Sequence, residues 1–163
     1  MSRTGEPAAQ RTPEEVLAAL GIDISDYGAP VANYVSAVRT GNLLFLAGHG
    51  PRRRDGKMIV GRVGDELTVE EAYEASRVTA IRMIITLKSH LGDLSRLRRI
   101  VEVTGMVWAV PDFEHHPKVI DGASDLLVEV FGERGRHARA AIGMGSLPFR
   151  TPVEFKLIAE VDP

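Results

Sequence analysis

The sequence predicts an α+β fold in which two helices pack on one face of a mixed β-sheet. The 163 residues have the length of one domain, and 44% of them are hydrophobic while 26% are charged, as in folded globular proteins. Apolar periodicity and turn residues indicate the order helix, three strands, long helix, strand, helix, two strands. Packing both longer helices on one face of the sheet is the simplest way to bury their apolar stripes.

The chain is expected to begin with a flexible tail over residues 1–11, followed by a single domain over 12–163. Thr12 is a good N-cap residue, Pro13 suits the first helical position, and two glutamates follow in the first turn. A short helix therefore begins here, and Gly21 predicts where it ends.

A β-hairpin is expected next. Two apolar runs, 34–38 and 43–47, flank a turn that contains Gly41. A third strand is expected over 58–63, after a basic loop with three consecutive arginines at 52–54.

The strongest helix of the chain is predicted after Thr68. Thr68 and Glu71 form a capping box, and small and apolar residues then recur at steps of three and four as far as Leu91. Gly92 is the expected stop.

The last third of the chain predicts one more helix between strands. Residues 100–110 are rich in β-branched side chains and predict a long strand. A helix is expected over about 117–131, and strands over 138–144 and 153–161 complete the fold. Many strand positions are apolar on both faces, so we expect another subunit to cover the face that the helices leave open.

Composition excludes several functional classes. The 20 basic and 22 acidic residues give a net charge of −2, which argues against a dedicated nucleic-acid binder. The sequence has no cysteine, so disulfides, thiolate catalysis and cysteine-based zinc sites are excluded. The first residues lack the apolar core of a signal peptide, and no run approaches the roughly 20 apolar residues of a membrane helix. We therefore expect a cytoplasmic protein with no membrane partner.

Arg139 and Glu154 are the most informative candidate site residues. Arg139 opens an apolar run in which an unpaired charge would be costly, so it should pair with the carboxylate of a ligand or with an internal one such as Glu154. Glu154, near the start of the final strand, could position a water or move a proton, or could simply belong to a polar strand face.

Several motifs in the right order resemble the reactive-intermediate deaminase family, also called Rid or YjgF-like and formerly L-PSP endoribonuclease. The resemblance spans roughly residues 30–161, and the N-terminal helix and the 112–137 segment suggest a longer-chain branch. The motifs are Tyr34-Val35, Gly41 to Gly48, Pro51, Leu91 to Leu94, Val101 to Val107, Ala138-Arg139-Ala140, Leu147-Pro148 and Val153 to Ala159.

The resemblance implies a chorismate-mutase-like fold, a homotrimer, and sites in clefts between subunits. In such a cleft, water hydrolyses an enamine or imine of an amino acid to a 2-keto acid and ammonia without a cofactor. By this resemblance Arg139 holds the substrate carboxylate and Glu154 activates or positions the water. Tyr34 lines the pocket, and backbone groups at Gly48 and Ala140 fix the plane of the substrate.

Three positions differ from the usual family pattern. Ala47 stands where many members have a serine, and Ala141 where many have a cysteine. Asp121, which we expect to contact the substrate, stands where an asparagine is usual. The arginine and the glutamate are retained, but part of the polar lining is not.

Three functions therefore remain open. The first is hydrolysis of small enamine or imine intermediates, and the second is a non-catalytic regulatory trimer that binds small carboxylates. The third, an endoribonuclease or translation inhibitor, is disfavoured by the charge balance. The resemblance implies that no cofactor is needed. We also expect no metal, because His115 and His116 are adjacent and adjacent histidines rarely face one ion.

Overall fold

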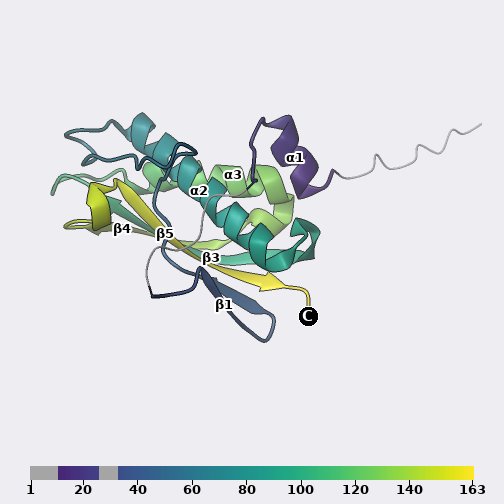
Figure 1. Ribbon diagram of the computed structural model, residues 1–163. Coiled ribbons are helices and arrows are strands. Elements are labelled where there is room, and N and C mark those ends of the chain that lie inside the picture. The colour runs from purple at the N-terminus through teal and green to yellow at the C-terminus, as the bar shows by residue number, and fades with distance from the viewer. Residues whose placement is uncertain (1–10, 26–32) are drawn as a thin grey trace, which may run out of the picture.

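The computed structural model describes residues 11–25 and 33–163, and within them a single mixed sheet carries the helices on one side (Figure 1). The tail expected over residues 1–11 falls almost entirely outside the described residues. The helices and strands are α1 (Pro13–Ala19), β1 (Ala37–Thr40), β2 (Leu43–Leu46), α2 (Val69–Leu91), β3 (Leu97–Trp108), α3 (His116–Phe131), β4 (Ala138–Met144) and β5 (Val153–Val161). Short 3-10 turns lie at η1 (Leu94–Arg96), η2 (Gly132–Gly135) and η3 (Pro148–Arg150).

The sheet has the strand order β1-β2-β5-β3-β4. Every neighbouring pair is antiparallel except β3 and β4, which are parallel and joined through α3. A parallel pair needs such a crossover, because a short turn cannot return the chain to the start of the next strand. The predicted α+β class, with its mixed sheet and helices on one face, is confirmed.

Local capping signals fix where the helices begin. At the start of α2, the Glu71 amide donates to the Thr68 hydroxyl at 3.1 Å, and the Thr68 amide donates to the Glu71 carboxylate at 2.8 Å. Thr12 and Glu15 make the same reciprocal pair at α1. Each pair satisfies two backbone donors that the first helical turn leaves open, which is why these two starts could be read from the sequence.

The strand expected over 58–63 is not formed. Its backbone amides bond to three separate segments instead of one partner strand: Ile59 to the Pro51 carbonyl, Gly61 to that of Arg150 and Val63 to that of Trp108. Gly61 also has a positive φ of 131°, which interrupts the extended conformation. The sheet of the described residues therefore has five strands, and residues 58–63 form a loop that crosses one end of it.

The hairpin is confirmed with a shifted first strand. Register pairs Ala37 with Leu46 and Thr40 with Leu43, so β1 begins three residues after Tyr34. Tyr34 is 56% exposed and lies before the strand.

The core lies between the sheet and the pair α2 and α3. Gly122 sets how closely these two helices approach, because a Cβ at this position would collide with the backbone carbonyl of Tyr73. The fully buried side chains around this contact include Met83, Ile84, Leu87, Ile120, Leu126, Leu127, Val103, Phe155 and Leu157.

The opposite face of the sheet has no helix over it in the described part of the chain (Figure 1). Val38 and Phe45 pair in register on this face, and Ile142 and Met144 extend it across β4. All four are exposed, by 37–57%. Charged side chains of β5, among them Lys156 and Glu160, lie on the same face between these apolar residues. The expectation that another subunit covers this face stays a prediction.

Candidate functional site

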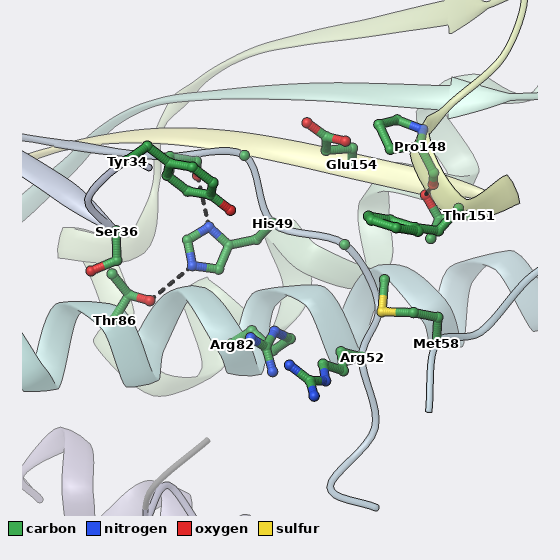
Figure 2. Close-up of a pocket in the computed structure, with 14 residues that line it drawn as sticks. Tyr34, Ser36, His49, Arg52, Met58, Arg82, Thr86, Pro148, Thr151 and Glu154 are labelled. Carbon is green, nitrogen blue, oxygen red and sulfur yellow. Dashed lines mark hydrogen bonds between the residues drawn. The ribbon is translucent and has the colours of Figure 1, made fainter. Parts of the chain in front are cut away.

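A pocket of about 440 Å³ opens where the chain leaves β2 and runs beside β5. The 47–50 segment runs through the middle of this pocket. It joins β5 through two backbone hydrogen bonds between His49 and Phe155, each of 2.9 Å. Figure 2 shows Glu154 on one side of this segment, and Arg82 and Thr86 of α2 on the other. The lining residues are Tyr34, Ser36, Ala47, Gly48, His49, Gly50, Arg52, Met58, Arg82, Thr86, Pro148, Phe149, Thr151 and Glu154.

Glu154 is the acidic residue of this pocket. It alternates along β5 with Val153 and Phe155, which point into the core, so its carboxylate projects from the open face of the sheet. Partial burial raises the pKa of Glu154 above the ordinary value of 4.5, because desolvation disfavours the charged form. A carboxyl group in this state can exchange a proton with a ligand more readily than an exposed glutamate can.

Gly48 gives the Glu154 carboxylate its place. A Cβ at position 48 would collide with Oε1 of Glu154, so a larger residue would push this carboxylate, the mobile end of its side chain, away from the backbone. The glycine at this position therefore leaves room for a side chain that lines the pocket.

His49 is held in its neutral form beneath the pocket. Its Nδ1 contacts the Ala47 carbonyl oxygen at 2.7 Å, and its Nε2 contacts the Thr86 hydroxyl at 2.8 Å. A carbonyl only accepts, so Nδ1 carries the proton and Nε2 accepts from Thr86. Burial, and secondarily the charge of Arg82, lower the pKa of His49. With both nitrogens engaged, His49 braces the 47–50 segment against α2 and has no free nitrogen to offer a ligand.

Arg139 lies outside this pocket. Its Nη1 donates to Oδ1 of Asp121 at 2.8 Å and to the Ser124 hydroxyl at 3.0 Å, and both acceptors are on α3. The internal carboxylate that it meets is therefore Asp121 and not Glu154. The exposed strand β4 leaves the guanidinium accessible, with 24% of the side chain exposed.

A short polar network extends from Arg139 to His137. The Ser124 hydroxyl that accepts from Arg139 lies 3.0 Å from Nε2 of His137, whose Nδ1 lies 2.6 Å from the Gly135 carbonyl oxygen. Burial, and then the charge of Arg139, lower the pKa of His137, so its neutral ring can accept from Ser124. This network fixes the guanidinium on the helix side of β4.

Within one chain, Arg139 and Glu154 belong to opposite faces of the sheet. Arg139 is in register with Val103 and Glu154 with Met106, and β3 separates the two strands. The structure thus brings Tyr34, Gly48 and Glu154 together, and groups Arg139, Ala140 and Asp121 separately along α3 and β4.

Sequence reasoning did not find Thr86, Met58 or Phe149 as lining residues. Thr86 is polar on the buried stripe of α2, which was an available signal. Met58 and Phe149 lie in segments whose path depends on long-range backbone bonds, so no local pattern indicated them.

Residues 11–25 and 33–163 show neither a metal-binding cluster nor a helix that could span a membrane. They hold no group of three or more histidine, aspartate or glutamate side chains placed to bind a metal ion. None of their helices is both long and apolar enough to cross a membrane.

Comparison with known proteins gives consistent matches over nearly the whole chain. The family model described as "YjgF/chorismate mutase-like, putative endoribonuclease" matches residues 14–161. Protein TCP17 of Trypanosoma cruzi is 40% identical over 144 residues, which are 88% of this chain and 90% of that protein.

Two solved structures are similar in both sequence and fold. A protein of unknown function from Agrobacterium tumefaciens is 42% identical with a TM-score of 0.84, covering 93% of this chain and 94% of that one. A protein described as a putative endoribonuclease from Shewanella oneidensis is 36% identical with a TM-score of 0.88, covering 93% and 100%. The chorismate-mutase-like fold expected from the sequence is confirmed.

Proposed function

The chain belongs to the YjgF/chorismate mutase-like family, and on this premise we propose that it hydrolyses small enamine or imine intermediates to 2-keto acids and ammonia. The reaction needs no cofactor and takes place in a cleft between two subunits of a homotrimer. The observation that carries the proposal is the half-buried carboxylate of Glu154, set against Gly48 in a pocket, with its pKa raised by desolvation.

The second half of the site comes from a neighbouring subunit. Arg139 is the residue that matches the family arginine expected to hold the substrate carboxylate. In its own chain, however, it lies on the opposite face of the sheet from Glu154. β4 is an edge strand of the sheet, so a second copy that packs on the open face would bring this edge, which carries Arg139, beside the pocket of the first. The exposed Ile142 and Met144 of β4 favour this arrangement, because their burial would drive the contact.

In the proposed reaction Glu154 acts first as a base and then as an acid. Water adds to the imine carbon while Glu154 accepts one proton from that water, and the C=N double bond becomes a C–N single bond. Glu154 passes this proton to the nitrogen, which gives a carbinolamine with one hydroxyl and one amino group. Glu154 then takes the proton of that hydroxyl and delivers it to the nitrogen as well, so that the C–N bond breaks, the C=O bond forms and ammonia leaves. Glu154 ends in the state in which it began, which is general acid–base catalysis. The Arg139 guanidinium neutralises the substrate carboxylate and orients the reacting carbon.

The experiment generates 2-imino acids in place with an amino-acid oxidase and follows the release of ammonia. The protein should accelerate this release over buffer, and both Arg139→Ala and Glu154→Gln should abolish the acceleration. Arg98→Ala is the matched control, because Arg98 pairs with the exposed Asp162 and contacts neither group of site residues. If the wild-type protein gives no acceleration, hydrolysis is wrong.

A mixing experiment tests the shared site directly. Co-expression of Arg139→Ala and Glu154→Gln chains gives mixed trimers in which some clefts join an intact arginine to an intact glutamate. Random assembly makes about a quarter of the clefts intact, so about a quarter of the activity should return. A site contained within one chain would recover nothing.

A non-catalytic carboxylate-binding trimer is the second candidate. It is favoured by Ala47 and Ala141, which supply no polar side chain to the site, and by the ion pair that already occupies Arg139. Saturable binding of 2-keto acids that depends on Arg139, with no ammonia release, would establish this function in place of hydrolysis.

The family description and the Shewanella oneidensis relative also mention an endoribonuclease. His49, the histidine that lines the pocket, has both ring nitrogens engaged within the protein. RNA cleavage that survives purification and disappears in Glu154→Gln would favour this function.

A further inference from the structure

Phe149 combines exposure and backbone strain at the mouth of the pocket. Its side chain is 80% exposed, although Leu147 and Thr151 on either side of it are buried. Its φ of 57° lies in the left-handed region, and so does the φ of 58° at Arg150. A bulky residue rarely adopts this conformation, and such outliers gather where function constrains the backbone.

The surroundings of Phe149 hold the strained turn in place. The Arg150 guanidinium donates to both carboxylate oxygens of Glu66, at 2.7 and 2.9 Å, and lies 5.7 Å from the centre of the Trp108 ring. The Arg150 carbonyl accepts from the Gly61 amide at 2.9 Å. These contacts hold Arg150, the residue that follows Phe149, at this turn.

Apolar side chains gather at the same end of the pocket, and the hydroxyl of Thr151, which also lies there, donates to the Pro148 carbonyl at 3.0 Å. Met58 and Pro148 also line the pocket, and Figure 2 shows them together at the end opposite Tyr34, with Glu154 between the two ends. A substrate whose reacting carbon lies at Glu154 has Tyr34 on one side and this end on the other, and an apolar side chain would be removed from water at this end. The charged lining residues Arg52 and Arg82 lie on the other side of the 47–50 segment from Glu154.

We propose that Phe149 is a specificity-determining residue that forms, with Met58 and Pro148, an apolar wall for the substrate side chain. The preferred substrates are then imines of amino acids with aliphatic or aromatic side chains, such as those derived from leucine or phenylalanine. This inference rests on the proposed hydrolysis at Glu154 and specifies its substrate class. Covering the ring with such a side chain removes apolar surface from water, which is the source of the preference.

The test compares the leucine-derived and alanine-derived imines in Phe149→Asn and Phe149→Leu. Asparagine tolerates the left-handed conformation and removes the apolar ring, so folding is preserved while the wall is lost. Phe149→Asn should lower kcat/KM about 10-fold or more for the leucine-derived imine and change it less than about twofold for the alanine-derived one. Phe149→Leu should keep most of the preference. Leu20→Ser, which removes a half-exposed apolar side chain outside the pocket, should change neither value.

Two other results would overturn the inference. One is an equal loss for both imines, and the other is a change of oligomeric state in light scattering, which would place Phe149 in a subunit contact.

A binding measurement separates failure of this inference from failure of hydrolysis. If 4-methyl-2-oxopentanoate binds more tightly than pyruvate and Phe149→Asn removes the difference, the apolar wall is supported even in a protein that turns over no imine. If the two keto acids bind alike, the wall is refuted.

Discussion

Because Arg139 forms an ion pair with Asp121, we expect this chain to restrain the arginine that we propose as the substrate-binding group. The hydrogen bonds of Arg139 to Asp121 and Ser124 use Nη1, so a substrate carboxylate on its other N–H groups would lie near Asp121, whose negative charge repels it. The two side chains are 24% and 45% exposed, so solvent screens the pair and it contributes at most about 1 kcal/mol. One kcal/mol corresponds to about a fivefold change in affinity. Asp121→Asn should therefore tighten the binding of a 2-keto acid by about two- to fivefold.

Calorimetric titration of wild-type protein and variants with a 2-keto acid measures this effect. Asparagine keeps an oxygen that can accept from Arg139, so the position of the guanidinium is retained while the competing charge is removed. Asp125→Asn is the matched control, because Asp125 lies one turn further along α3 and accepts from Tyr73 rather than from Arg139. It makes the same change in net charge and should leave the affinity unaltered. If Asp121→Asn instead weakens binding as severely as Arg139→Ala, Asp121 positions the arginine and does not compete for it, and the reasoning is refuted.

Three further outcomes are expected. Glu154→Gln should lower kcat by about 10²–10⁴-fold, as loss of a general acid–base group does. The same substitution should raise the melting temperature at neutral pH. A carboxyl group whose pKa is raised by folding adds stability below its unfolded-state pKa, and this stability is lost as the pH rises through its folded-state pKa. The ionised Glu154 therefore costs stability at pH 7, and glutamine removes that cost. A drop in melting temperature would contradict this sign. For the same reason, wild-type kcat/KM should fall on acidification with a midpoint above 4.5, and an acid limb of the pH–rate profile that persists unchanged in Glu154→Gln would exclude Glu154 as the base. Thr86→Val should cost about 1–3 kcal/mol of unfolding free energy in urea denaturation, because it leaves the buried Nε2 of His49 without its donor, whereas Thr86→Ser should cost much less.

The elements that the sequence predicted correctly are those encoded within a few neighbouring residues. The capping box at Thr68 and the glycine at position 92 bound α2 as expected, and β4 and β5 have the predicted limits. The segment 58–63 was predicted wrongly because its β-branched composition is a local property, whereas its backbone partners are Pro51, Arg150 and Trp108. A strand needs one continuous partner, and no local pattern contains that information.

Some features of the candidate site could likewise be predicted from the sequence, and others could not. By itself, the sequence determined the family, the fold class and the residues worth testing, because motifs such as those around Arg139 and Glu154 are short and keep their order. Only the tertiary structure decided that these two residues lie on opposite faces of the sheet, that Asp121 neutralises Arg139, and that Phe149 stands exposed beside the pocket. These facts depend on strand register and on contacts between segments far apart in the chain, such as the link of Glu66 to Arg150. Such contacts exist only after the chain has folded, so no local pattern could have indicated them.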